Sequence, residues 1–267
     1  IFALPFAYIG VFLAAGQWPG WRIFVFLTLA MVTIRSFAMA INRLVDEKFD
    51  RANVRTQDRP LVTGEMTSRQ GWALCAMTAA VFVLSCAGLN SLCLMLSPVA
   101  LAWAALYSLS KRFTWMTHFW LGSVLGLAPV GGWLAYDPVF TVTAVLFALG
   151  VTFWVAGFDI LYSCQDETFD RQAGLNSIPS IFGIPAALGF STLSHVIAAV
   201  FFFLAGWSAG LGMIYVLVWA VISGVLIWEH TLVSADDLSR LNMAFFTLNG
   251  IIAVILWAGV LADLFLT

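Results

Sequence analysis

Long stretches without a charged side chain constrain this chain more than any other feature. No Asp, Glu, Lys or Arg occurs between Gly71 and Ser110, or between Gln172 and Trp228. A helix needs about 20 apolar residues to cross a bilayer, so each stretch is long enough for two crossings. Only 10% of the 267 residues are charged, against about 25% in ordinary soluble domains. This excludes a soluble enzyme, a disordered chain and a nucleic-acid binder, and it favours an all-α protein with many membrane spans.

Breaks in the apolar pattern divide the chain into nine predicted transmembrane helices. The polar residues around Asn90 split the first long stretch, and Asp137-Pro138 is a typical turn sequence. The predicted spans lie within 1–16, 21–41, 71–88, 91–110, 113–136, 138–158, 186–206, 210–228 and 241–263. We treat residues 1–267 as one transmembrane domain. Because the sequence starts at an apolar Ile1 and not at Met, we expect a short N-terminal segment to precede it.

Basic residues indicate the orientation of these helices. Eleven of the 12 Lys and Arg residues follow even-numbered predicted helices or, for Arg35, lie near the end of one; only Arg22 lies on the other side. Cytoplasmic loops carry an excess of Lys and Arg. We therefore expect the N-terminus and these loops in the cytoplasm and the C-terminus outside, in a bacterial inner membrane.

Two of the predicted cytoplasmic loops carry nearly the same sequence. Residues 46–51 read Asp-Glu-Lys-Phe-Asp-Arg and residues 166–171 read Asp-Glu-Thr-Phe-Asp-Arg, so five of six positions match at an offset of 120. The repeat is centred on 42–61 and 159–181. Repeated halves of a membrane protein often meet around one central site. We expect a bundle of two related halves, with polar cytoplasmic caps after the second and sixth helices.

The spacing of acidic residues in this repeat predicts a metal site. Asn42, Asp46 and Asp50 lie at i, i+4 and i+8, so all three can face one side of a helix. Asp166 and Asp170 repeat the spacing. Carboxylates brought together repel each other unless a cation lies between them, and oxygen ligands without His or Cys suit Mg²⁺. Solvent-exposed charges on a surface helix are the alternative interpretation.

Basic residues on the same face are candidates for binding phosphate. Arg forms bidentate hydrogen bonds to phosphate oxygens, and Lys supplies a compact positive charge. The candidates are Arg51, Arg55, Arg59, Lys111, Arg112 and Arg171. The alternative is that these residues only set the membrane topology. His118 follows Lys111-Arg112 closely enough to approach the same site.

Together, the two repeats resemble the signatures of the UbiA superfamily of intramembrane prenyltransferases. The first motif is Asn42-x-x-x-Asp46-x-x-x-Asp50, followed by Arg55-Thr56-x-x-Arg59-Pro60-Leu61. The second is Asp159-x-x-Tyr162-x-x-x-Asp166-x-x-x-Asp170. The resemblance covers nearly the whole chain.

The resemblance implies Mg²⁺-dependent transfer of a polyprenyl group from a polyprenyl diphosphate to an aromatic acceptor, within the lipid bilayer. Two Mg²⁺ ions would be held by Asn42, Asp46, Asp50, Asp166 and Asp170. Asp159 would orient or deprotonate the phenol of the acceptor, and Tyr162 would contact the diphosphate or the acceptor. Arg35 or Arg43 would bind a carboxylate on the acceptor.

The identity of the acceptor is open between two hydroxylated aromatic carboxylates. Residues 157–179 are similar to the 4-hydroxybenzoate polyprenyltransferases of ubiquinone synthesis, which makes 4-hydroxybenzoate the first candidate. They are also similar to a sister group that prenylates a dihydroxynaphthoate in the futalosine route to menaquinone. Many ubiquinone enzymes carry Asn-Asp at the start of the first motif, whereas this chain has Asn42-Arg43, as in the sister group.

Two other classes of membrane protein also use clustered carboxylates. A CDP-alcohol phosphotransferase would show Asp-x-x-Asp-Gly followed by Ala-Arg, and this sequence has neither. A cation transporter would place its carboxylates near the middle of the membrane, whereas these lie at predicted helix ends. The transporter is kept as a remote alternative.

Overall fold

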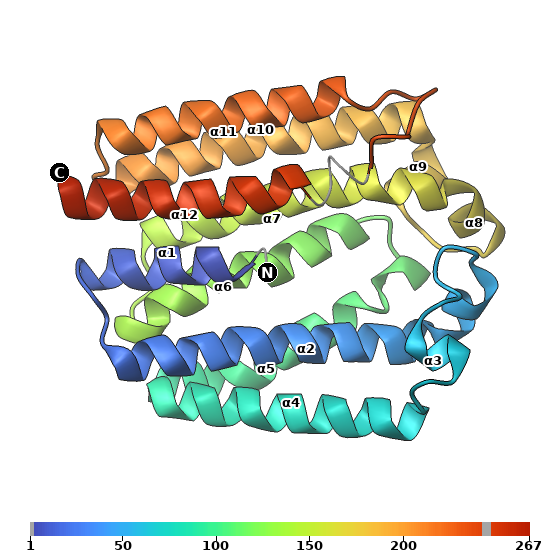
Figure 1. Ribbon diagram of the computed structural model, residues 1–267, viewed down its shortest axis with the longest axis horizontal. Coiled ribbons are helices and arrows are strands. Elements are labelled where there is room, and N and C mark those ends of the chain that lie inside the picture. The colour runs from blue at the N-terminus through green and yellow to red at the C-terminus, as the bar shows by residue number, and fades with distance from the viewer. Residues whose placement is uncertain (1–2, 242–246) are drawn as a thin grey trace.

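A computed structural model of the chain describes residues 3–241 and 247–267, and every regular element within these ranges is a helix. Most of the longer helices run roughly along the long axis in Figure 1, and within the described residues there are nine longer helices. They are α1 (Ala3–Ala15), α2 (Trp21–Ala52), α4 (Ser68–Leu89), α5 (Ser91–Tyr107), α6 (Thr117–Tyr136), α7 (Val142–Ser163), α10 (Ile184–Ser208), α11 (Met213–Thr231) and α12 (Asn249–Leu266).

Seven of these helices are long and apolar enough to cross a membrane, counted over the described ranges. The two others, α1 and α5, are apolar but shorter. The all-helical class is thus confirmed, while nine crossings and the division into two related halves stay predictions. The predicted break near Asn90 is confirmed, because α4 ends at Leu89 and the Asn90 side chain caps α5 by accepting from the Cys93 backbone N–H at 2.9 Å.

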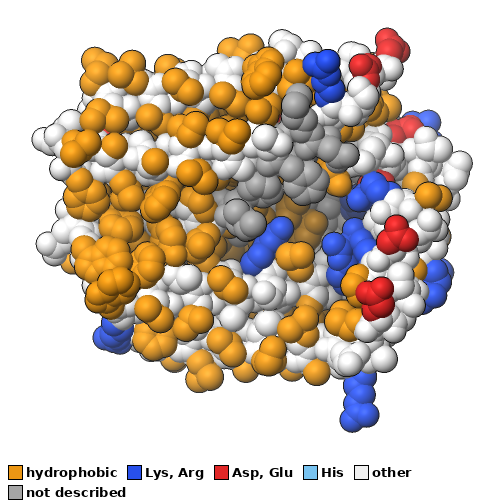
Figure 2. Space-filling model, viewed as in Figure 1, with side chains coloured by type: hydrophobic (Ala, Val, Ile, Leu, Met, Phe, Trp, Pro, Cys, Tyr) orange, Lys and Arg blue, Asp and Glu red, His pale blue; other side chains and the backbone are white. Residues whose placement is uncertain are grey.

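Short helices gather at one end of the bundle, at the right of Figure 1. They are α3 (Pro60–Thr63), η1 (Ser110–Arg112), η2 (Cys164–Asp166), α8 (Glu167–Gln172) and α9 (Ile178–Phe182). Figure 2 shows acidic and basic side chains concentrated at the same end, while apolar side chains cover much of the remaining face. Backbone in irregular or short elements needs polar partners, which the hydrocarbon core does not supply, so this end is suited to lie outside it.

The two repeats form different local structures despite their similar sequences. The first motif lies on one uninterrupted helix, since α2 continues through Asp50 to Ala52. In the second motif α7 ends at Ser163, and the 3₁₀ turn η2 separates it from α8. Asp166 therefore ends the turn, while Asp170 belongs to α8, so the two do not share the face of a single helix.

Buried polar groups connect the helices on the α7–α12 side. Helix α11 runs three residues beyond its predicted end at Trp228, so Glu229 lies inside it and is fully buried. Asn249 of α12 donates to the Glu229 carboxylate at 3.2 Å and accepts from the Trp154 indole N–H at 2.8 Å. Buried polar side chains of this kind hold neighbouring helices in register through hydrogen bonds.

Glycines let helix α6 pack very closely against α1 and α7. A Cβ atom at Gly132 would lie 1.9 Å from the carbonyl oxygen of Ala7 in α1, and one at Gly122 would lie 2.1 Å from that of Thr152 in α7. Small residues allow helix backbones to approach in this way.

Gly132→Ala is expected to destabilise the protein by about 1–3 kcal/mol, because its Cβ would overlap a backbone atom that cannot rotate away. Gly131→Ala is the matched control, because a Cβ there meets no atom within 4 Å. Thermal unfolding in detergent would show a lower Tm for Gly132→Ala alone. An equal Tm for the two variants would contradict this packing.

Candidate functional site

Two adjoining cavities lie inside the bundle. One is polar, has a volume of about 330 Å³ and lies at the charged end; the other is mainly apolar and has a volume of about 580 Å³. They share four lining residues: Asn42, Arg43, Arg59 and Tyr107. All the carboxylates predicted for the site line the polar cavity: Asp46, Asp50, Asp159, Asp166 and Asp170. The apolar cavity is lined mainly by side chains of α2, α4, α5 and α6.

Asp46 is held at the centre of the first motif. The Asn42 amide donates to Asp46 Oδ2 at 2.9 Å, as their i, i+4 spacing on α2 predicts. Arg112 Nη2 lies 3.5 Å from Asp46 Oδ1 and donates to the Val45 carbonyl at 2.7 Å. The η1 turn, which carries Arg112, is thereby attached to α2.

Asp50 receives a basic residue from the loop that follows α2. The Arg59 guanidinium forms an ion pair with the buried Asp50 carboxylate. The buried Thr56 hydroxyl donates to the Asp50 carbonyl at 3.0 Å, which folds the loop back over the end of the helix.

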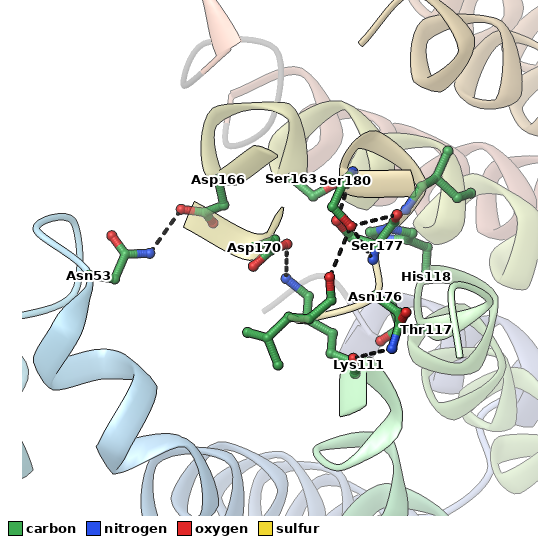
Figure 3. Close-up of polar contacts among 12 residues, drawn as sticks. Asn53, Lys111, Thr117, His118, Ser163, Asp166, Asp170, Asn176, Ser177 and Ser180 are labelled. Carbon is green, nitrogen blue, oxygen red and sulfur yellow. Dashed lines mark hydrogen bonds and ion pairs between the residues drawn. The ribbon is translucent and has the colours of Figure 1, made fainter. Parts of the chain in front are cut away.

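Asp166 forms the contact that joins the two repeats. Arg55 donates to it through two atoms, Nε at 2.9 Å and Nη2 at 2.6 Å, and the Asn53 amide adds a third hydrogen bond at 3.1 Å. Figure 3 shows Asn53 and Asp166 pointing toward each other from separate parts of the chain. Burial lowers the pKa of Arg55, but the hydrogen bonds and charge of Asp166 outweigh burial and raise it. Arg55 therefore stays charged at any physiological pH.

Asp170 pairs with Lys111 on the other side of the cavity. Lys111 Nζ donates to Asp170 Oδ2 at 3.0 Å, and the Lys111 carbonyl accepts from the Asn176 backbone at 2.7 Å (Figure 3). Burial lowers the pKa of Lys111, yet the negative charges of Asp170 and Asp159 outweigh burial and raise it. Two carboxylates of the second repeat, Asp166 and Asp170, thus fix the positions of Arg55 and Lys111.

Asp159 and Tyr162 project from the last turns of α7 into the same polar cavity. The Asp159 carboxylate lies 2.7 Å from Nδ1 of His118, and the Arg55 guanidinium lies over the Tyr162 ring, 5.4 Å from its centroid.

The predicted basic residues separate into two groups. Arg55, Arg59, Lys111 and Arg112 line the polar cavity. Arg51 and Arg171 do not: each pairs with the glutamate four residues earlier, Glu47 at 3.0 Å and Glu167 at 2.5 Å, and their side chains are 59% and 60% exposed. Arg43 lines both cavities, and Arg35 lines the apolar one.

Several lining residues were not among the sequence candidates. Asn53 and Thr56 belong to this group. Their position directly after the first motif could have identified them as candidates. Tyr107, the last residue of α5, lines both cavities.

The oxygen ligands of the polar cavity suit a metal ion whose coordination is completed by the substrate. Over residues 3–241 and 247–267, no three His, Cys, Asp or Glu side chains lie close enough together to hold a metal ion. Four of the carboxylates face a basic side chain instead. Mg²⁺ typically takes one or two carboxylates and completes its shell with water and substrate phosphates. Carboxylates on opposite walls of one cavity, with an amide and no sulfur or imidazole ligand, fit that mode of binding.

Comparison with known proteins gives a consistent result. The model of the UbiA prenyltransferase family matches residues 3–251. The 4-hydroxybenzoate octaprenyltransferase of Photobacterium profundum is 28% identical, covering 94% of this chain and 86% of that protein. The enzyme of the same name from Nitrosomonas eutropha is 30% identical, over 95% of this chain and 88% of that protein. These relatives are too distant to fix the substrate.

Solved structures show the same fold. A UbiA homolog from Aeropyrum pernix K1, in its apo form, superposes with a TM-score of 0.89 at 36% identity, covering 98% of this chain and 96% of that one. A UbiA homolog from Archaeoglobus fulgidus bound to GPP and Mg²⁺ has a TM-score of 0.73 at 22% identity, covering 98% and 95%.

Proposed function

The chain belongs to the UbiA prenyltransferase family, and on that premise we propose that it transfers a polyprenyl group from a polyprenyl diphosphate to a hydroxylated aromatic carboxylate, most simply 4-hydroxybenzoate. It is thus a multi-pass integral membrane enzyme. The observation that carries the proposal is the junction of the two cavities at Asn42, Arg43, Arg59 and Tyr107. A polyprenyl diphosphate has the same two parts, a charged head and an apolar tail, joined at the carbon that reacts.

The diphosphate would bind in the polar cavity. Arg55, Arg59, Lys111 and Arg112 already lie there and need only exchange carboxylate oxygens for phosphate oxygens. Asn42, Asp46, Asp50, Asp166 and Asp170 would hold Mg²⁺, with two ions proposed, one for each repeat. A UbiA homolog from Archaeoglobus fulgidus is bound to GPP and Mg²⁺, which supports Mg²⁺ and a prenyl diphosphate as the ligands proposed for this cavity. Bound Mg²⁺ supplies charge neutralisation on the departing diphosphate.

The acceptor would react where the cavities meet. As the allylic C–O bond breaks, its electron pair leaves with the diphosphate, a ring carbon of the acceptor bonds to the allylic carbon, and that ring carbon loses its proton. Asp159 orients the phenol and takes its hydroxyl proton as the new C–C bond forms, and it returns that proton to the oxygen when the ring carbon loses its own, so one proton is released for each diphosphate. Tyr162 contacts the acceptor or the diphosphate. Arg43, which lines both cavities, or Arg35, which lines the apolar one, would bind the acceptor carboxylate. The apolar walls keep water away from the allylic cation.

The second candidate acceptor is a dihydroxynaphthoate. The pair Asn42-Arg43 favours it, because Arg43 replaces the Asp found there in many ubiquinone enzymes. Both acceptors carry a hydroxyl and a carboxylate, so the proposed roles of Asp159 and Arg43 apply to either one.

We further propose that the polar cavity faces the cytoplasm of a bacterium, with the N-terminus inside and the C-terminus outside. Its support is the strong bias of Lys and Arg toward the charged end of the bundle (Figure 2).

Asp46→Ala and Asp166→Ala should each lower Mg²⁺-dependent prenyl transfer by at least about 100-fold, since each removes a charged oxygen ligand from one wall of the cavity. The exposed Asp58, which lies on the same face outside the cavity, provides the control Asp58→Ala. Product formation by detergent-solubilised protein, with Tm recorded for each variant, measures the effect. Full activity in either cavity variant would contradict the metal-site assignment.

Replacing an arginine that lines the polar cavity should weaken binding of the diphosphate, whereas replacing one outside it should not. Arg55→Gln should raise the KM for polyprenyl diphosphate by roughly 10- to 100-fold, as expected for lost charge-assisted hydrogen bonds. Arg51→Gln should leave the KM unchanged, because Arg51 pairs with Glu47 on the exposed side. Steady-state kinetics at saturating acceptor distinguish the two, and equal effects would show that the cavity does not define the diphosphate site.

Supplying 4-hydroxybenzoate and a dihydroxynaphthoate in parallel, each with the same polyprenyl diphosphate, identifies the acceptor. The proposal expects a prenylated 4-hydroxybenzoate, detected by mass spectrometry. Exclusive prenylation of the naphthoate would establish the second candidate, and no product from either would reject the proposed acceptor class.

A further inference from the structure

A fully buried histidine stands behind the proposed acceptor residue. His118, near the start of α6, is 0% exposed, and its Nδ1 lies 2.7 Å from Asp159 Oδ2 on the neighbouring helix α7. Asp159 itself lines the polar cavity, and its side chain is 22% exposed. The histidine therefore contacts the carboxylate from the protein interior, on the side away from a ligand in the cavity.

The second ring nitrogen fixes which tautomer is present. His118 Nε2 accepts from the backbone N–H of Ile178 at 3.3 Å. Ile178 is the first residue of α9, where the N–H has no partner within its own helix, and the Ser177 hydroxyl is used by the Ser180 N–H. A backbone N–H can only donate, so Nε2 is the acceptor and the proton of the neutral ring is on Nδ1. His118 thus donates a hydrogen bond to Asp159.

This arrangement leaves one carboxylate oxygen for a ligand. Within residues 3–241 and 247–267, His118 is the one hydrogen-bond partner of Asp159, and it engages Oδ2. Because both ring nitrogens are bonded and the ring is enclosed, neither the imidazole nor the carboxylate can turn freely. Oδ1 is then the atom free to accept from a group in the cavity.

The same segment also places the cation for the diphosphate. Asn176, two residues before Ile178, donates through its backbone and its side chain to the Lys111 carbonyl, at 2.7 and 3.2 Å. Figure 3 shows His118, Asn176 and Ser177 grouped near Lys111 and Asp170. The start of α9 therefore holds Lys111 on one side and His118 on the other.

We propose that His118 is a positioning residue for the acceptor: it fixes Asp159 so that Oδ1 accepts the hydrogen bond of a phenolic hydroxyl beside the carbon that is prenylated. This deepens the proposed function and rests on it. It also restricts the acceptor to aromatic rings with a hydroxyl donor next to the reacting position. By comparison, removing the hydrogen-bond partner that orients a metal-binding side chain typically lowers metal affinity or activity 10- to 100-fold.

Two substitutions separate the two hydrogen bonds of the ring. The amide of His118→Asn can replace Nδ1 and donate to Asp159, while His118→Gln reaches the position of Nε2 and can accept from Ile178. The proposal expects His118→Gln to lower kcat/KM for the acceptor by roughly 10- to 100-fold. It expects His118→Asn to retain most of that value, and both variants to keep the KM for polyprenyl diphosphate.

A purely structural role predicts the reverse order. His118→Gln would then retain activity, and His118→Asn would lose Tm and every kinetic parameter together; either result overturns the proposal. If both variants fold poorly, Asp159→Asn supplies the second test. That variant keeps His118 in place and removes the carboxylate that it orients. The proposal expects a lower kcat/KM for the acceptor with an unchanged KM for polyprenyl diphosphate, and an unchanged kcat/KM for the acceptor would overturn it.

Failure of the inference can be told apart from failure of the proposed function. A wild-type protein that prenylates no hydroxylated aromatic acceptor rejects both. An active wild-type enzyme whose His118→Gln variant has unchanged acceptor kinetics rejects the positioning role alone.

Discussion

The ion pair between Arg55 and Asp166 is the contact on which the arrangement of the site depends. It joins the loop after α2 to η2, the turn that follows α7, although these segments are more than a hundred residues apart, and it does so with two hydrogen bonds. Asp50–Arg59 and Asp170–Lys111 secure the two sides of the same cavity. Removing one partner of such a pair leaves the other charge uncompensated where it is partly or fully shielded from water. The carboxylates and cations therefore hold each other in place across the cavity.

The membrane explains why these charges are gathered at one end. Charged groups are costly within a bilayer unless they are paired or face a polar cavity, and this chain confines nearly all of them to the loops and helix ends around the site. One exception is the buried Asp263 at the far end of the bundle, which caps α11 by accepting from the backbone N–H of Gly212 and of Tyr215. A polar cavity next to a larger apolar one follows from the same separation of charged and apolar residues.

Sequence alone predicted the helical class and the family, and it named the residues that line the polar cavity most prominently. The periodic spacing of Asn42, Asp46 and Asp50 is a property of one helix, so it could be read locally. The break after Ser163 could not, because the two repeats have nearly the same sequence and differ in their tertiary contacts. Arg51 lies on α2 and Arg55 in the loop that follows, so whether Arg55 faces the cavity depends on how that loop folds. The orientation of His118 likewise depends on a hydrogen bond from Ile178, sixty residues away in the sequence.

The central claim is that the two repeats together bind the diphosphate of a prenyl donor through Mg²⁺ and the cavity cations. A structure of the protein with Mg²⁺ and a non-reactive prenyl thiolodiphosphate tests it most directly. The account predicts the diphosphate in the polar cavity, between Asp46 and Asp50 on one wall and Asp166 and Asp170 on the other, with the prenyl chain in the apolar cavity. A diphosphate bound elsewhere, or a prenyl chain outside the apolar cavity, would contradict it.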